Sequence, residues 1–304
     1  MSCVLSLSPT YYRALKRLTL ELAGIRLGDD HRFLVETRLS ALARKEGFAN
    51  LEQMIDELFS RGQTRLAIHV VSALLQRATR FFEDRPSFEM IGDILLPKLH
   101  QFYKGGTVRI LSYGCSSGQE AYSIAILLDK LSASFAGMKF EIIGVDYPSW
   151  ALESAKEGRF THFEVQRGLP IRHLVSYFDR AGEDWVVKKD LREKVRFVDH
   201  NLLADIGDLG IFQIVMFCGK LTQYSPPAVI RILRSLSRLV RENGYLVLGS
   251  GEEIGEANYG FDIFQDATGC YKKHSHSKPE NIAEKPISTF QETAKGTHRD
   301  SSVA

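Results

Sequence analysis

The residues with the clearest potential for chemistry form a short segment rich in glycine and serine. It reads Gly114-Cys115-Ser116-Ser117-Gly118-Gln119-Glu120 and lies between an apolar run at 108–111 and a helical pattern at 121–131. Small residues at such a crossover let a ligand approach the backbone, and the following helix offers N–H groups that have no partner within the helix. Gly114 and Gly118 lack the spacing G-x-G-x-x-G, so the dinucleotide fingerprint is absent. A plain strand-to-helix turn explains these glycines equally well.

Two polar side chains follow later apolar runs in the same way. Asp146 comes directly after the run at 140–145, where a carboxylate can accept hydrogen bonds from both hydroxyl groups of a ribose. Asn201 follows the run at 195–198, and its amide can both donate to and accept from an adenine edge. Each has a simpler explanation, because Asp146 could cap a helix near Pro148 and Asn201 could be an exposed loop residue. Together with the first segment, they favour one site for a ligand that contains adenosine.

The elements that position these residues alternate between strand-like and helical patterns. Short runs rich in β-branched and aromatic residues, with helical stretches between them, occupy 108–111, 140–145, 195–198, 212–217 and 245–248. This alternation is typical of a doubly wound α/β domain with a mostly parallel sheet. Ligands bind at the carboxyl ends of the strands of such a sheet, where the residues above would meet.

The first eighty or so residues show apolar side chains at helical spacing and little sign of strands. Ser8-Pro9 predicts the start of a first helix that ends at Gly24, and three further helical stripes follow as far as Leu75. The region after Lys273 is too polar to bury a core. We therefore expect a helical N-terminal domain at 1–82, an α/β domain at 83–273 with an insertion near 160–195, and a disordered tail at 274–304.

The composition is that of a soluble globular protein with two structural units. Of 304 residues, 44% are hydrophobic and 25% are charged, and Lys+Arg 39 against Asp+Glu 37 gives a net charge of +2. This balance argues against a nucleic-acid partner bound through bulk electrostatics. The four cysteines stand far apart without zinc-ligand spacing, and no apolar run is long enough to span a membrane. We expect a cytoplasmic protein with no structural metal and no membrane insertion.

The residues and spacing of these motifs resemble those of the chemotaxis-receptor methyltransferases. That family transfers a methyl group from S-adenosylmethionine (SAM) to glutamate side chains of chemoreceptors. The resemblance extends from about Leu5 to Glu253. Its anchors are Ala23–Leu27, Leu34–Leu39, Thr79-Arg80-Phe81-Phe82, Gly114–Ala125, Asp146 with Ala151–Ala155, Asn201-Leu202-Leu203, Phe217-Cys218, Tyr224 and Gly249–Glu252. It implies a class I SAM-methyltransferase fold, a Rossmann-like doubly wound sheet, preceded by a small all-helical domain.

The resemblance also implies roles for individual residues. Methyl transfer would take place beside Thr79 and Tyr224. Since a glutamate side chain is ionised near neutral pH, its carboxylate can attack the sulfonium methyl group without a strong base. Catalysis would then rest on positioning and on the handling of charge. The cofactor would be bound by Gly114, Ser116, Gly118, Glu120, Asp146, Asn201 and Leu202.

The partner implied by the resemblance is the cytoplasmic domain of a chemoreceptor or a related signalling protein. A basic run in the helical domain would face the acidic receptor. The alternative is an ordinary solvated helix face. The run consists of Arg32, Arg38, Arg44 and Lys45.

Three positions near the expected transfer site depart from the family pattern. Glu83 replaces an arginine, Cys218-Gly219-Lys220 replaces Cys-Arg-Asn, and Ser225 replaces an aromatic residue. Like charges about 4 Å apart repel by roughly 1 kcal/mol in water and roughly 4 kcal/mol at an effective dielectric of 20, so Glu83 would oppose the substrate carboxylate. Lys220 is our candidate for the missing positive charge, and hence for a catalytic residue. Arg80 and Arg85 are the other candidates.

Two further functions are consistent with these departures. One is a catalytically impaired SAM-binding sensor or scaffold of a chemotaxis-like pathway. A nicotinamide-dependent oxidoreductase is more distant, since the dinucleotide glycine spacing is missing. We predict an active protein-glutamate O-methyltransferase, because Thr79, Tyr224 and the cofactor motifs are retained.

Overall fold

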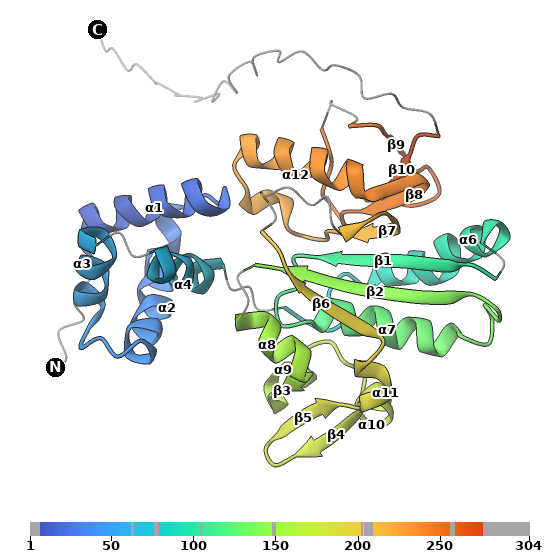
Figure 1. The fold of residues 1–304 in the computed structure, drawn as a ribbon, viewed down its shortest axis with the longest axis horizontal. Coiled ribbons are helices and arrows are strands. Elements are labelled where there is room, and N and C mark those ends of the chain that lie inside the picture. The colour runs from blue at the N-terminus through green and yellow to red at the C-terminus, as the bar shows by residue number, and fades with distance from the viewer. Residues whose placement is uncertain are drawn as a thin grey trace, which may run out of the picture.

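The computed structural model describes residues 7–61, 64–75, 79–103, 105–147, 150–201, 203, 209–255 and 259–275. These residues form a helical bundle, a central sheet with helices on both faces and a small second sheet (Figure 1). Leu202 and residues 276–304, most of the expected tail, lie outside this part of the chain. No helix within it has the length and apolar character that a membrane span requires.

The N-terminal bundle contains the four helices that the sequence predicts. The first begins after Ser8, whose side chain accepts a hydrogen bond from the N–H of Tyr11, and ends at Gly24 in the left-handed conformation (φ +68°). A short 3₁₀ turn at Asp29–His31 leads into the second helix. The helices are α1 (Pro9–Ala23), α2 (Arg32–Lys45), α3 (Leu51–Arg61) and α4 (Thr64–Leu75).

The bundle has a hydrophobic core of its own. Leu15, Leu39, Met54 and Val70, one from each helix, are fully buried in it. The cores on the two faces of the central sheet consist of other residues. On this basis we propose residues 1–82 as a helical domain and 83–273 as an α/β domain.

The central sheet has seven strands in the order β6-β2-β1-β7-β8-β10-β9. The first five of these are parallel to one another, which confirms the predicted doubly wound arrangement. Two short antiparallel strands, β9 and β10, extend one edge and have no counterpart in the sequence prediction. The strands are β1 (Thr107–Tyr113), β2 (Lys139–Asp146), β6 (Val195–Asp199), β7 (Phe212–Met216), β8 (Val240–Val247), β9 (Phe261–Ile263) and β10 (Cys270–Lys273).

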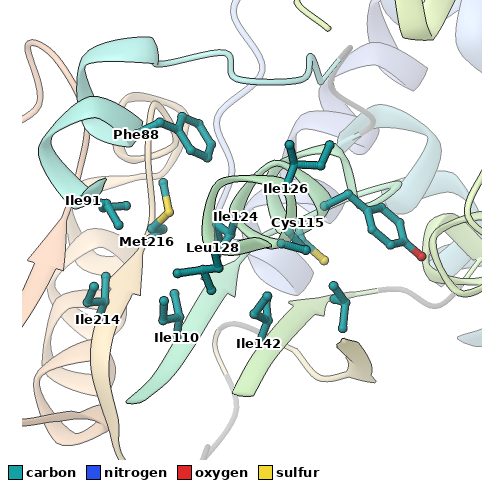
Figure 2. Packing of buried hydrophobic residues seen from close by; sticks show 14 of the residues in the cluster. Phe88, Ile91, Ile110, Cys115, Ile124, Ile126, Leu128, Ile142, Ile214 and Met216 are labelled. Atoms are coloured by element: carbon teal, nitrogen blue, oxygen red, sulfur yellow. The ribbon is translucent and has the colours of Figure 1, made fainter. Parts of the chain in front are cut away.

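Helices cover both faces of this sheet because both faces are apolar. Ile110, Ile142 and Ile214 are register partners on three neighbouring strands, and Figure 2 shows them below Ile124 and Leu128 of α7. Helix α12 packs on the opposite face. The helices of this domain are α5 (Arg85–Met90), a π-helical turn (Ile91–Leu95), α6 (Leu96–Phe102), α7 (Gln119–Leu131), α8 (Trp150–Glu157) and α12 (Pro226–Leu239).

The predicted insertion near 160–195 is a small subdomain with a three-stranded antiparallel sheet. Phe81 joins it to the rest of the domain, since its ring contacts those of Phe160 and Phe178 at centroid distances of 5.0 and 5.6 Å. The N–H of Phe81 also donates to the carbonyl of Arg167. The elements are β3 (Arg159–Phe160), α9 (His162–Gln166), α10 (Ile171–Tyr177), β4 (Phe178–Ala181), β5 (Asp184–Val187) and α11 (Lys189–Arg192).

Gly168 makes this junction sensitive to a single methyl group. A Cβ atom there would lie 2.1 Å from the carbonyl oxygen of Phe81, whereas a Cβ at Gly182 would meet nothing within 4 Å. Both residues have positive φ, +89° and +68°. We expect Gly168→Ala to lower the free energy of unfolding by about 3 kcal/mol and Gly182→Ala by about 1 kcal/mol, because only the first adds a backbone clash to the conformational strain. Urea denaturation measures the difference, and equal losses would contradict this packing.

Candidate functional site

A cavity of about 680 Å³ lies at the carboxyl ends of the parallel strands. Its size is in the range of small-molecule sites in proteins. Residues at or after the ends of five neighbouring strands line it, and the sheet order β6-β2-β1-β7-β8 sets their order across the cavity. In that order they are Asn201, Asp146, Gly114, Lys220 and Ser250. The chain continues from β1 to β2 on one side and returns to β7 on the other, so the cavity lies at the switch point of the sheet.

The glycine-rich turn after β1 reaches the cavity through Gly114, Cys115 and Ser116. The N–H groups of Gly114 and Cys115 both donate to the carbonyl of Val145, at 2.7 and 3.0 Å, which fixes the turn against β2. Gly118, by contrast, is not among the lining residues. A Cβ at Gly118 would lie 3.0 Å from that of Ala155 and 3.1 Å from the ring of Phe197, so this glycine permits close packing of α7.

Asp146 is held in one orientation by the backbone. Its carboxylate accepts hydrogen bonds from the N–H groups of Ser116 and Tyr147. Burial raises the pKa of Asp146, while these two N–H groups and the charge of Lys220 oppose the rise. The half-buried side chain lines the cavity. This arrangement suits a carboxylate that accepts hydrogen bonds from the two hydroxyls of a ribose.

Asn201 lies at the β6 end of the same cavity, next to Leu203. Its side-chain oxygen accepts a hydrogen bond from the N–H of Leu203 at 2.9 Å, which orients the amide. Leu202, the other residue predicted at this end, lies outside the described residues.

Lys220 and Glu120 form an ion pair between the ends of β7 and β1. The ammonium nitrogen of Lys220 lies 3.2 and 3.1 Å from the two carboxylate oxygens of Glu120. Glu120 also accepts a hydrogen bond from the hydroxyl of Ser112 at 2.7 Å. Both charged side chains line the cavity and are largely buried. The predicted catalytic cation is therefore bound to a predicted cofactor residue.

A buried carboxylate holds the loop that carries Lys220 and Tyr224. Glu252 is 7% exposed and accepts a hydrogen bond from the N–H of Leu221 at 2.7 Å. Burial raises the pKa of Glu252, and backbone N–H groups of Leu221 and its neighbours oppose this rise. Sequence reasoning placed Glu252 in a family motif but gave it no role; the structure shows that it anchors this loop.

Thr79 and Tyr224, the residues expected beside the transferred methyl group, line the same cavity. The hydroxyl of Thr79 donates to the side-chain oxygen of Gln119, which also accepts from Ser117 at 2.9 Å. Tyr224 is 9% exposed, and its backbone pairs with that of Ile25 in an isolated antiparallel bridge. Gln119 and the Ile25 bridge are positioning contacts that the sequence did not reveal.

The charged residues near the junction differ in their access to the cavity. Glu83 and Arg80 are exposed and line it. Asp84 also lines it and accepts hydrogen bonds from the backbone N–H and the hydroxyl of Ser250, at 3.2 and 3.0 Å. Arg85 is not a lining residue and pairs with Glu89 at 2.8 Å. Of the three candidate cations, Arg80 and Lys220 therefore reach the site and Arg85 does not.

The helical domain supplies one wall of the cavity. Arg38 of α2 lines it and donates to the carbonyl of Leu74 at 2.8 Å. Arg32 is engaged elsewhere, with the carbonyl of Leu7 and the carboxylate of Glu36. Arg44 and Lys45 are exposed at the end of α2. Arg32 and Arg38 of the predicted basic run are thus held by contacts within the helical domain.

Comparison with known proteins agrees with this geometry. The family model "CheR methyltransferase, SAM binding domain" matches residues 77–270. "Chemotaxis protein methyltransferase Cher2" of Pseudomonas putida is 32% identical over 243 residues, 78% of this chain and 88% of the relative. "Chemotaxis protein methyltransferase 1" of Pseudomonas aeruginosa is 32% identical over 252 residues, 81% of this chain and 91% of the relative.

Similarity to a solved structure is weaker. A TehB-like SAM-dependent methyltransferase from Corynebacterium glutamicum is 14% identical, with a TM-score of 0.33, over 59% of this chain and 82% of that chain. The family match and the two Pseudomonas relatives support the predicted enzyme over the sensor or scaffold. The chain, with a class I fold and a SAM-binding domain, belongs to the CheR methyltransferase family.

Proposed function

We propose that this protein transfers the methyl group of SAM to glutamate side chains in the cytoplasmic domain of a chemoreceptor or a related signalling protein. The observation that carries the proposal is that Asn201, Asp146, Glu120 and Tyr224, which lie at or after the ends of four neighbouring strands, line one cavity. In the order of the sheet, these residues would meet adenine, ribose, the methionine part and the transferred methyl group.

The residues present fit SAM. The carboxylate of Asp146, oriented by two N–H groups, accepts hydrogen bonds from ribose hydroxyls. Gly114 and Ser116 leave room for the cofactor beside the backbone. SAM supplies a methyl group on a positively charged sulfur. The protein therefore has to bind this group, exclude water and orient the acceptor.

The acceptor end of the cavity suits a carboxylate. A glutamate oxygen forms a bond to the methyl carbon as the bond from that carbon to sulfur breaks, and no proton is transferred. The products are a methyl ester and neutral S-adenosylhomocysteine (SAH). Thr79 and Tyr224 would border the reacting atoms, and the cations Arg38 and Arg80 in the lining would attract the substrate. Glu83 in the same lining would oppose it.

The proposal is tested with SAM that carries an isotopic label in its methyl group and with cytoplasmic fragments of chemoreceptors from the same organism. We expect labelled fragments that release methanol in mild alkali, because carboxylate methyl esters are base-labile. A protein that binds SAH but yields no methanol with any of these receptors would contradict methyl transfer and favour the sensor or scaffold. The matched control is the Asp146→Ala variant, which should produce no label.

A further inference from the structure

The ion pair of Lys220 and Glu120 presents both signs of charge at one point of the cavity. The side chains are 11% and 17% exposed, and the ammonium nitrogen contacts both carboxylate oxygens. Charges so far removed from water need partners of opposite sign. Lys220 and Glu120 lie 100 positions apart in the sequence, and here each neutralises the charge of the other. The fold therefore holds this ion pair in the cavity wall.

The position of the pair relates it to one part of the cofactor. Glu120 lies in the first turn of α7, the helix that follows β1, and Lys220 follows β7, the next strand of the sheet. Asp146, the residue that would hold the ribose, ends β2 on the other side of β1. Glu120, Lys220 and Asp146 all line the same cavity. The part of the cofactor next to the ribose would reach the ion pair.

That part is the amino-acid end of SAM, which carries one carboxylate and one ammonium group. On the basis of the proposed function, we infer that Lys220 binds the carboxylate and that Glu120 binds the ammonium group. Both charges of the cofactor would then meet a partner of opposite sign, and the two protein charges would each retain a partner. Lys220 is accordingly a cofactor-binding residue, which replaces its predicted role at the substrate carboxylate.

Other cations of the lining are less suited to this role. Arg38 belongs to the helical domain and is bound to the carbonyl of Leu74. Arg80 is exposed to solvent, which screens its charge. Lys220 combines burial with a carboxylate partner at the β1–β7 junction. The substrate carboxylate would then be met by Arg38 or Arg80 and not by Lys220.

Calorimetric titration with ligands that differ only at the amino-acid end tests this assignment. SAH has both groups, S-adenosyl-3-thiopropylamine lacks the carboxylate, and 5′-methylthioadenosine lacks both. We expect Lys220→Met to weaken SAH binding about 10- to 100-fold, the effect of one hydrogen bond between charged groups, and to weaken neither of the other ligands. Glu120→Gln should weaken SAH and the thiopropylamine but not methylthioadenosine.

Two further variants keep the test interpretable. Lys220→Met/Glu120→Gln removes both charges together, so no buried charge is left unpaired; it should bind SAH weakly and methylthioadenosine normally. Lys98→Met, at an exposed pair with Asp266, is the control and should bind all three ligands as the wild type does. Unchanged SAH affinity in Lys220→Met, or an equal loss of all three ligands, would overturn the assignment. Wild-type protein that binds none of them would overturn the proposed function and this assignment with it.

Discussion

Asp146→Ala is expected to reduce SAH affinity at least about 100-fold, to the point where a calorimetric titration of the folded protein shows no binding. The physical reason is that two ribose hydroxyls would lose the same acceptor. The N–H groups of Ser116 and Tyr147 hold this carboxylate in place, and no other residue of β2 lines the cavity. The expected loss is therefore larger than for any other single residue of the cofactor site.

Asp199→Ala is the matched control for this experiment. Asp199 is the register partner of Asp146 on β6, but it is exposed and does not line the cavity. Its removal deletes the same charge one strand away and should leave SAH affinity unchanged. If Asp146→Ala bound SAH as tightly as Asp199→Ala, the ribose site would have to lie elsewhere.

Glu83→Arg is expected to increase kcat/KM for the receptor substrate about 10-fold or more at saturating SAM. The substitution replaces a repelling charge at the cavity wall with an attracting one, and each like-charge contact in a partly solvated site costs roughly 1 to 4 kcal/mol. Glu83→Gln removes the repulsion only and should give a gain of about 3-fold. Because Glu83 is exposed, both gains should shrink as salt is raised.

Glu89→Arg makes the same change of charge on the outer side of α5. Glu89 pairs with Arg85 and does not line the cavity, so its reversal tests whether net charge alone explains the gain. The initial rate of methyl ester formation at several receptor concentrations measures the effect. Equal gains for the two arginine variants, or a slower Glu83→Arg enzyme, would show that the substrate carboxylate does not pass Glu83.

The parts of the fold that depend on local patterns could be predicted from the sequence. Apolar runs and caps identified the five parallel strands and the helices of the bundle, because burial on both faces of a sheet and the needs of a helix end leave a signature in neighbouring residues. The edge strands β9 and β10 were missed. They contain only three and four residues, and their register with β8 is set by tertiary contacts.

The candidate site shows the same division. The sequence predicted that Gly114, Asp146 and Asn201 meet at one edge of the sheet, and all three line the cavity. It could not reveal that Lys220 pairs with Glu120, since the two lie 100 residues apart and meet only when β7 packs beside β1. The sequence also could not show that Gly118 allows close packing against Ala155 and Phe197, because those residues meet it only in the folded structure.

The wall formed by the helical domain is a further feature without a local signal. Arg38 lines the cavity, and the bundle is joined to the α/β domain at the bridge between Ile25 and Tyr224. The N–H of Ser225 also donates to the carbonyl of Gly24 at 2.7 Å. Both contacts are made by backbone atoms, which every residue has. The residue types therefore do not predict these contacts.

The central claim is methyl transfer to a carboxylate, and the position of the label tests it most directly. A receptor fragment is treated with the protein and with SAM that carries a deuterated methyl group, and its peptides are mapped by tandem mass spectrometry before and after mild alkali. The structure and the family predict label on glutamate side chains, all of it lost in alkali. Label on lysine, arginine or cysteine that survives alkali would contradict the claim.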